Sequence, residues 1–140
     1  MVPGLIRVVL AEDNEIVRKG IGIFLNRAQD IEVIGEACDG LEALILVNQL
    51  QPDLLILDVE MPRLNGIEVV RRLKEAGANT HILVLSAYDD RQYIREMLLY
   101  GVDGYLIKDE APERIVEAVR DIARGQKDWV SPTMKAKLNK

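Results

Sequence analysis

Apolar runs alternate with amphipathic stretches along the chain. Five of the runs are short and mostly rich in branched aliphatic residues, which is typical of strands buried on both faces of a sheet. They cover residues 6–10, 31–37, 54–57, 82–85 and 104–107. Helical periodicity follows each run, as at Val17, Ile21, Phe24 and Leu25 with their i, i+4, i+7, i+8 spacing. The pattern therefore predicts five successive strand–helix units.

Capping and turn residues set the expected helix boundaries. Asn14 or Asp13 is placed to cap the first helix, and Pro52 follows the second. Pro112 stands in the first turn of the last helix, and Gly125 comes just after its end. Repeated strand–helix units form parallel strands joined by right-handed crossovers, so we expect an α/β fold with a doubly wound parallel sheet. Periodicity alone does not give the order of the strands.

The length of the chain and its tail define the expected domains. The 140 residues fit one domain with its own core, and we assign residues 1–125 to it. Residues 126–140 differ from the rest. There, Ser131 and Pro132 form an N-cap and N1 pair before a polar, basic stretch. This segment is either a short helix or a linker.

Composition excludes several classes of protein. No apolar run approaches the roughly 18 residues of a membrane helix, and the N-terminus lacks a signal peptide, so we expect a cytoplasmic protein without a membrane partner. Cys38 is the only cysteine, which excludes a disulfide framework, and we expect its side chain to be buried. With a net charge of −5 and no basic stripe, this stretch is not expected to bind nucleic acid by itself.

Residues with reactive side chains follow four of the five expected strands. Glu12 and Asp13 follow the first strand, Asp58 the third, Ser86 the fourth and Lys108 the fifth. The carboxyl ends of parallel strands share one edge of the sheet, so these groups should meet there. Clustered carboxylates favour a hard cation such as Mg²⁺, and a carboxylate can act as the nucleophile in phosphoryl transfer. A hydroxyl and an ammonium group nearby can bind phosphoryl oxygens.

Four segments resemble the signature segments of the receiver domains of two-component response regulators. They are residues 6–14 (IRVVLAEDN), 54–62 (LLILDVEMP), 84–87 (VLSA) and 105–108 (YLIK), in family order. The resemblance covers about residues 5–125. It implies a (βα)5 flavodoxin-like sheet of order 2-1-3-4-5. It also implies a phosphorylation-dependent signalling switch rather than an enzyme, with Mg²⁺ as cofactor and a sensor histidine kinase as partner.

The resemblance assigns roles to the acidic residues. Asp58 would accept the phosphoryl group and also contact the metal. Asp13 would be a direct metal ligand, Glu12 a second acid acting mostly through water, and the backbone carbonyl of Glu60 a third protein ligand. These assignments predict one compact Mg²⁺ site around the phosphoacceptor.

Three further residues would sense the phosphoryl group. Lys108 resembles the lysine that pairs with it, Ser86 the switch hydroxyl, and Tyr105 the aromatic residue whose rotamer reports the state. Phosphorylation would draw Ser86 toward the new charge, and the vacated space would let the ring of Tyr105 turn inward. We expect this motion to remodel the face formed by the fourth helix, the fifth strand and the fifth helix.

The sequence departs from the common family pattern at two positions. Glu12 stands where many receivers have aspartate, and Asp109 stands where many have proline. The Lys108–Asp109 peptide is therefore trans, or cis at a cost of about 3–4 kcal/mol. Asp109 and the tail motif at residues 129–132 (WVSP) resemble regulators with LuxR-type helix-turn-helix domains. That class implies transcription regulation, homodimer formation on phosphorylation, and DNA binding only through a C-terminal domain missing from this chain.

Other interpretations of the same residues stay open. A stand-alone receiver would act through protein contacts alone. A phosphatase with an aspartate nucleophile would use Glu60, two residues after Asp58, as its general acid–base. A flavin-binding protein lacks support, because Glu12 and Asp13 would repel the flavin phosphate. Arg18 and Lys19, near the start of the first helix, are expected to face outward and to be available to a kinase.

Overall fold

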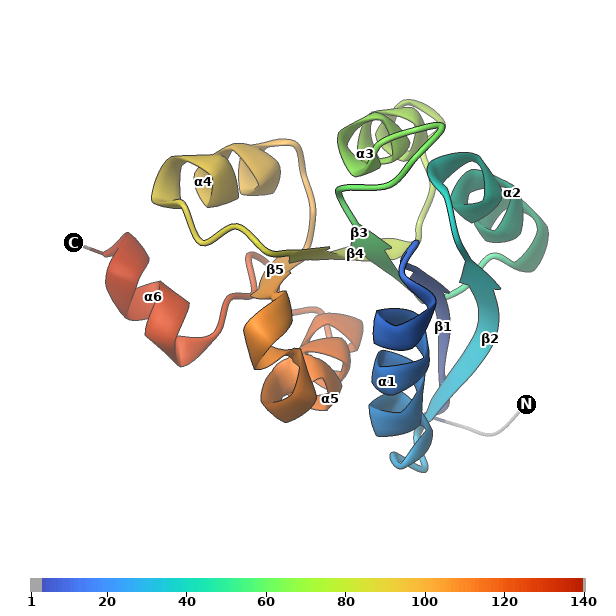
Figure 1. Cartoon of the computed structure of the whole chain (residues 1–140), viewed down its shortest axis with the longest axis horizontal. Coiled ribbons are helices and arrows are strands. Elements are labelled where there is room, and N and C mark those ends of the chain that lie inside the picture. The colour runs from blue at the N-terminus through green and yellow to red at the C-terminus, as the bar shows by residue number, and fades with distance from the viewer. Residues whose placement is uncertain (1–3, 140) are drawn as a thin grey trace.

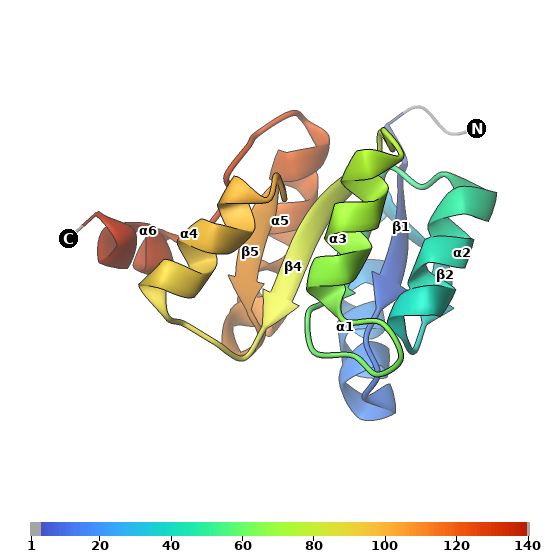
Figure 2. The same cartoon turned by 90° about the horizontal axis from the view of Figure 1, so that it is seen from above.

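A five-stranded parallel sheet forms the centre of the protein. The structure is a computed structural model that describes residues 4–139. The sheet has the order β2-β1-β3-β4-β5, and all neighbouring strands are parallel (Figure 2). The strands are β1 (Ile6–Ala11), β2 (Ile31–Ala37), β3 (Leu54–Asp58), β4 (His81–Ser86) and β5 (Gly104–Ile107). The predicted fold class and strand order are confirmed.

Helices cover both faces of this sheet. Figure 1 shows α1 and α5 on one face and α2, α3 and α4 on the other. The helices are α1 (Glu15–Asn26), α2 (Gly40–Leu50), α3 (Gly66–Glu75), α4 (Arg91–Leu99), α5 (Ala111–Ala123) and α6 (Pro132–Leu138). A short 3-10 turn, η1 (Lys108–Glu110), joins β5 to α5. This is the three-layer arrangement expected of a doubly wound sheet.

Alternate residues of the strands fill two separate cores. On β1, Val9 packs into the layer under α2, α3 and α4, whereas Val8 and Leu10 pack into the layer under α1 and α5. All three side chains are fully buried. Because each core strand is buried on both faces, it carries apolar residues at successive positions rather than at alternate ones. This explains why the strands appear in the sequence as continuous apolar runs.

Polar side chains cap the N-termini of the first three helices. The Asn14 side chain caps α1 by accepting a hydrogen bond from the Val17 amide, so Asn14 rather than Asp13 is the N-cap. Asp39 and Asn65 cap α2 and α3 in the same way. Such caps satisfy amide groups that have no partner within the helix. With Asn14 as the cap, the carboxylate of Asp13 is left for another role.

The chain after α5 packs back onto the sheet. The Trp129 amide donates to the carbonyl of Asp103 (2.9 Å), and the Trp129 carbonyl accepts from the Tyr105 amide (2.8 Å). Ser131 caps α6 as expected, so of the two alternatives for this segment, short helix or linker, the structure has the short helix. In Figure 1 this helix lies at the end of the sheet next to β5. Within residues 4–139, no helix is long and apolar enough to cross a membrane.

Candidate functional site

Residues at the carboxyl ends of β1, β3, β4 and β5 meet at one edge of the sheet. The arrowheads in Figure 2 show that the strands end on the same side. Glu12, Asp58 and Ser86 are fully buried there, whereas Asp13 is exposed at the mouth of the site. Lys108 lies between these extremes, with 25% of its side chain exposed. The structure therefore brings together the groups that the sequence placed at the strand ends.

Lys108 joins two of the buried carboxylates. Its Nζ lies 3.0 Å from Oε1 of Glu12 and 3.2 Å from Oδ2 of Asp58. The other carboxylate oxygen of Asp58, Oδ1, accepts a hydrogen bond from the Glu60 amide at 3.0 Å. These contacts fix the orientation of the Asp58 carboxylate. In residues 4–139 none of the peptide bonds is cis, so Lys108 reaches the site with a trans bond to Asp109.

The site holds more negative than positive charge. Burial, together with the hydrogen bond and charge of Asp58, raises the pKa of the Glu12 carboxyl from 4.5 to about 8, against the opposing effect of Lys108. Burial alone would lower the pKa of Lys108, but Glu12 and Asp58 outweigh it and raise that pKa. A single ammonium group thus compensates the buried carboxylates only in part.

The cluster has the chemistry of a site for a hard divalent cation. Glu12, Asp13 and Asp58 each offer a carboxylate oxygen, and these oxygens lie within 4.8 Å of one another. Oxygen ligands from one or two carboxylates, completed by water, are what Mg²⁺ prefers in proteins. A cation would also offset the effects of burial and of Asp58 that raise the pKa of Glu12. The residues present therefore fit Mg²⁺.

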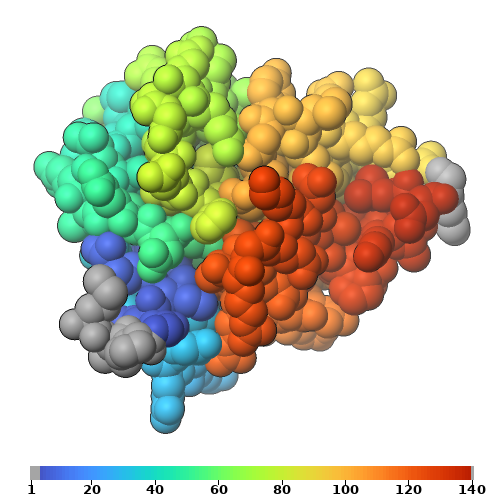
Figure 3. Space-filling model, turned by 180° about the vertical axis from the view of Figure 1, so that it is seen from behind, coloured from blue at the N-terminus to red at the C-terminus, as the bar shows by residue number. Residues whose placement is uncertain are grey.

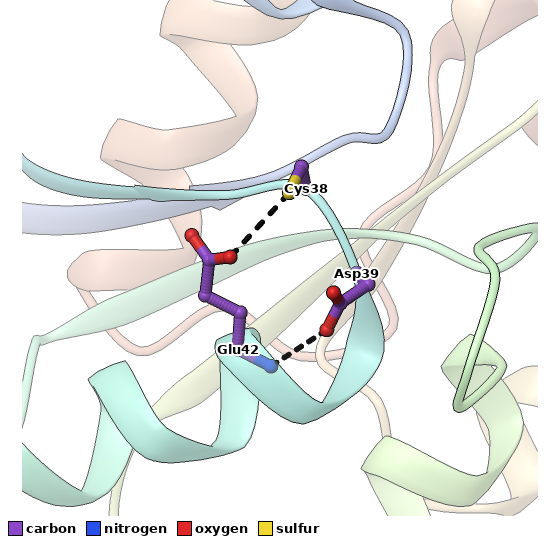
Figure 4. Close-up of side chains that lie close together, drawn as sticks. All are labelled: Cys38, Asp39 and Glu42. Atoms are coloured by element: carbon purple, nitrogen blue, oxygen red, sulfur yellow. Dashed lines mark hydrogen bonds between the residues drawn. The ribbon is translucent and has the colours of Figure 1, made fainter.

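A second group of possible ligands, Cys38, Asp39 and Glu42, belongs to the start of α2 (Figure 4). Asp39 caps the helix and pairs with Arg63 at 3.1 Å, and the Cys38 thiol contacts Glu42 at 3.4 Å. The expected burial of Cys38 is wrong, because β2 ends at Ala37 and Cys38 lies exposed in the turn after it. Glu42 raises the pKa of the Cys38 thiol, which disfavours the thiolate that binds metals.

Ser86 is connected to Tyr105 through the loop after β4. The Ser86 hydroxyl oxygen accepts a hydrogen bond from the Tyr88 amide (3.0 Å), and the Tyr105 hydroxyl donates to the Tyr88 carbonyl (2.8 Å). Only 1% of Tyr105 is exposed, so its ring already lies inside the fold. Burial raises the pKa of Tyr105 and keeps its hydroxyl protonated as a donor. A movement of Ser86 would therefore disturb the hydrogen bond of Tyr105.

Tyr88 lies beside these residues, although its sequence pattern did not predict a place there. Its hydroxyl lies 3.2 Å from Oε2 of Glu60, so the side chain links the loops after β4 and β3. The rings of Tyr88 and Tyr93 meet edge to face at 5.6 Å, and those of Tyr93 and Tyr105 at 6.2 Å. Its position two residues after Ser86 is the one signal in the sequence that points to it.

The expected outward orientation of Arg18 is also wrong. Only 17% of its side chain is exposed, because it reaches back from α1 toward the end of β1. Its Nη1 donates to the backbone carbonyl of Glu12 at 2.8 Å. Arg18 therefore contacts the loop that carries the acidic cluster.

A cleft of about 1100 Å³ opens at the opposite end of the sheet. Figure 3 shows the molecule from behind, with α3, α5 and the start of β1 around this region. The cleft is lined by residues such as Val47, Leu73, His81 and Arg120, and none of the predicted site residues lines it. The acidic cluster therefore lies outside this cleft, at the other edge of the sheet.

Comparison with known families identifies the class. The response regulator receiver domain family matches residues 8–120, which is most of the chain. The chain belongs to this family. The matched region contains all of the residues that converge at the strand ends.

Among curated proteins, the chain is similar to transcriptional regulators of the NarL/LuxR type. It is 41% identical to the uncharacterized transcriptional regulatory protein YxjL of Bacillus subtilis over 121 residues, 86% of this chain and 56% of YxjL. It is 38% identical to the oxygen regulatory protein NreC of Staphylococcus carnosus, covering 94% of this chain and 61% of NreC. It is 34% identical to the nitrate/nitrite response regulator NarL of Escherichia coli, covering 94% and 62%. The chain thus spans about three-fifths of the length of these relatives.

Solved structures agree with this assignment. The signal receiver domain of a NarL response regulator from Mycobacterium tuberculosis superposes with a TM-score of 0.84 and 35% identity, covering 88% of this chain and 99% of that one. A LuxR-family response regulator from Aurantimonas sp. gives a TM-score of 0.89 and 27% identity, covering 96% of each chain. The chain is the receiver domain of a NarL/LuxR-type response regulator.

Proposed function

We propose that Asp58 accepts a phosphoryl group from the phosphohistidine of a sensor histidine kinase, with Mg²⁺ bound at the acidic cluster. The observation that supports this most strongly is the buried Asp58 carboxylate, held by the Glu60 amide and by Lys108 beside two further acids. An isolated buried carboxylate would be costly. The burial of the Asp58 carboxylate beside these partners favours a reactive role over a structural one.

We assign a task to each residue of the site on this basis. A carboxylate oxygen of Asp58 attacks phosphorus, the bond from phosphorus to the kinase nitrogen breaks, and an acyl phosphate forms. Lys108, which spans Glu12 and Asp58, would pair with a phosphoryl oxygen, and Ser86 would donate to another. Asp13, Asp58, the Glu60 carbonyl and, through water, Glu12 would hold Mg²⁺, which would neutralise the negative charge that develops during the transfer.

Labelling with a small phosphodonor tests this function directly. Purified chain is incubated with acetyl phosphate with and without Mg²⁺, and the intact mass is measured at once. A mass increase by one phosphoryl group is expected only with Mg²⁺. Equal labelling in excess chelator would contradict the metal requirement, and no labelling in either condition would contradict the phosphoacceptor role.

Asp13→Asn should remove most of the thermal stabilisation that Mg²⁺ gives to the wild type. A ligand that binds only the folded state raises the melting temperature, and the folded state alone gathers these carboxylates. The same change should leave the metal-free protein as stable as the wild type or slightly more stable, since it removes a negative charge close to the Asp58 carboxylate. Differential scanning calorimetry at several Mg²⁺ concentrations measures both effects.

The matched control for this experiment is Asp109→Asn, the same chemical change at an exposed acid next to Lys108. It should keep the full response to Mg²⁺. A variant at Asp13 with an unchanged Mg²⁺ response would show that Asp13 is not a ligand.

Ser86→Ala should still be phosphorylated on Asp58 but should transmit the modification poorly. The new phosphoryl oxygens would draw the Ser86 hydroxyl away from the Tyr88 amide, and Tyr88 is the residue that holds the Tyr105 hydroxyl. Dimerisation or partner binding with and without beryllofluoride measures the coupling. Responses of equal size in wild type and variant would leave Ser86 without a role in the switch.

The wider role follows from the relatives. YxjL is named as a transcriptional regulatory protein, NreC as an oxygen regulatory protein and NarL as a nitrate/nitrite response regulator, and this chain covers about three-fifths of their length. We propose that the chain is the regulatory part of such a regulator, that DNA is bound by a C-terminal domain outside these residues, and that phosphorylation promotes a homodimer. A phosphatase is supported less well, because the Glu60 carboxylate is engaged by the Tyr88 hydroxyl.

A further inference from the structure

We propose that Arg18 is a positioning residue of the Mg²⁺ site, which holds the backbone of the β1–α1 loop so that Asp13 is presented to the cation. The proposal rests on the proposed function, because it takes the acidic cluster to be the metal site. Arg18 itself contacts neither the cation nor the phosphoryl group. It acts through the peptide that links Glu12 to Asp13.

Arg18 is held in place both at its backbone amide and at the guanidinium group of its side chain. It lies in the first turns of α1, where its amide donates to the Asn14 carbonyl at 2.9 Å. From there the side chain reaches back, and the guanidinium donates from Nη1 to the Glu12 carbonyl at 2.8 Å and from Nε to Oε1 of Glu36 at 3.2 Å. Only 17% of the side chain is exposed. A planar guanidinium can serve both acceptors at once, whereas an ammonium group presents a point charge.

These contacts help to fix the peptide group between Glu12 and Asp13. The Glu12 amide donates to the Ala37 carbonyl of β2 at 3.0 Å, and the Glu12 carbonyl accepts from Arg18. The carbonyl belongs to the peptide plane that leads into Asp13, so its orientation sets the direction in which the Asp13 side chain leaves the loop. The Asp13 carboxylate is exposed and has no packed surroundings to hold it. Its place beside Glu12 and Asp58 therefore depends on the backbone.

Charge adds to this effect. The carboxylates of Asp13 and Asp58 repel each other, and repulsion would push the exposed member, Asp13, outward. A hydrogen bond from a charged donor to the preceding carbonyl resists that displacement and is stronger than one from a neutral donor. Loss of such a pre-organising contact should weaken cation binding by about tenfold.

A purely structural role would give a different result. Arg18 also pairs with Glu36 on β2, and this pair could simply tie α1 to the sheet. Glu36→Gln removes the ion pair but leaves the hydrogen bond to the Glu12 carbonyl intact. It is therefore the matched control that separates the two contacts of the same guanidinium.

The experiment is a Mg²⁺ titration by isothermal calorimetry at a temperature well below the melting point of every variant. Arg18→Met keeps the aliphatic stem and its packing but removes the donors, and should bind Mg²⁺ about tenfold more weakly. Arg18→Lys retains one charged donor and should recover most of the affinity. Glu36→Gln should stay within about twofold of the wild type.

A double-mutant cycle shows whether Arg18 acts through Asp13. In the background of Asp13→Asn, the change Arg18→Met should have almost no further effect on Mg²⁺ affinity, because the residue it positions has lost its charge. An equal loss in both backgrounds would overturn the proposal. So would wild-type affinity in Arg18→Met, or a loss in Glu36→Gln as large as that in Arg18→Met.

The failure of the proposed function gives a separate result. If the wild type shows no Mg²⁺ binding at millimolar concentrations, the acidic cluster is not the metal site and the proposal falls with it. If the wild type binds and Arg18→Met binds equally well, the site is right and the role of Arg18 is wrong. Circular dichroism of each variant checks that the fold is retained in these comparisons.

Discussion

Asp58→Asn should abolish phosphorylation of the chain by acetyl phosphate while leaving the fold intact. Asparagine has nearly the same shape, and its amide oxygen can still accept the hydrogen bond from the Glu60 amide. Lys108 keeps its contact with Glu12 in the variant. What is lost is the anionic oxygen that attacks phosphorus, and an amide cannot replace it as a nucleophile. The mass spectrum of the intact protein after incubation with Mg²⁺ should show no phosphorylated species.

Two controls make this result specific. Asp109→Asn alters an exposed acid beside Lys108 and should be labelled like the wild type. The circular dichroism spectrum and melting curve of Asp58→Asn should show a folded protein. Phosphoryl incorporation that persists in the folded Asp58→Asn variant would place the acceptor elsewhere, and peptide mapping would then locate it.

Trp129→Ala should lower the free energy of unfolding by about 3–5 kcal/mol, the usual cost of truncating a buried aromatic residue. Only 2% of Trp129 is exposed, and it packs in the core formed with α1 and α5. Its indole Nε1 also donates to Oδ2 of Asp121 at 3.0 Å. Urea unfolding followed by circular dichroism measures the change, since the variant lacks the only tryptophan.

Trp129→Phe is the control for this change. It keeps most of the apolar volume but loses the indole donor, so it should cost far less than Trp129→Ala. A loss below about 1 kcal/mol for Trp129→Ala, within the range of surface substitutions, would mean that the segment after residue 125 is a detachable linker. A large loss of unfolding free energy would mean that the cooperative folding unit extends past residue 125, the domain boundary expected from the sequence.

The site was largely predictable because it is built from strand ends. Each buried strand is a continuous apolar run, and the first polar residues after it, such as Asp58 and Lys108, are visible in the sequence. A parallel sheet brings such ends together whatever the details of packing. The order of the strands could not be predicted in this way, because no local pattern encodes it. The order 2-1-3-4-5 was expected only from the family resemblance.

The errors concern side chains whose environment depends on the course of the backbone. Cys38 comes directly after the last residue of β2, and only the position of the turn decides whether it is buried. Arg18 lies on the polar side of an amphipathic helix, yet its long side chain donates a hydrogen bond to a backbone carbonyl. A pattern of apolar and polar residues does not show where backbone acceptors lie. Tyr88 was missed for a similar reason, since its partner comes from another loop.

The pairing of Trp129 with β5 also bears on how the protein behaves in a crowded solution. An open parallel sheet has two outer strands, and the free amides and carbonyls of such a strand can recruit strands from other molecules. At β5 the backbone of Trp129 occupies part of that edge through its bonds with Asp103 and Tyr105. A version of the chain cut after residue 125 would keep every residue of the phosphorylation site, yet it would carry an unprotected sheet edge and a tendency to aggregate.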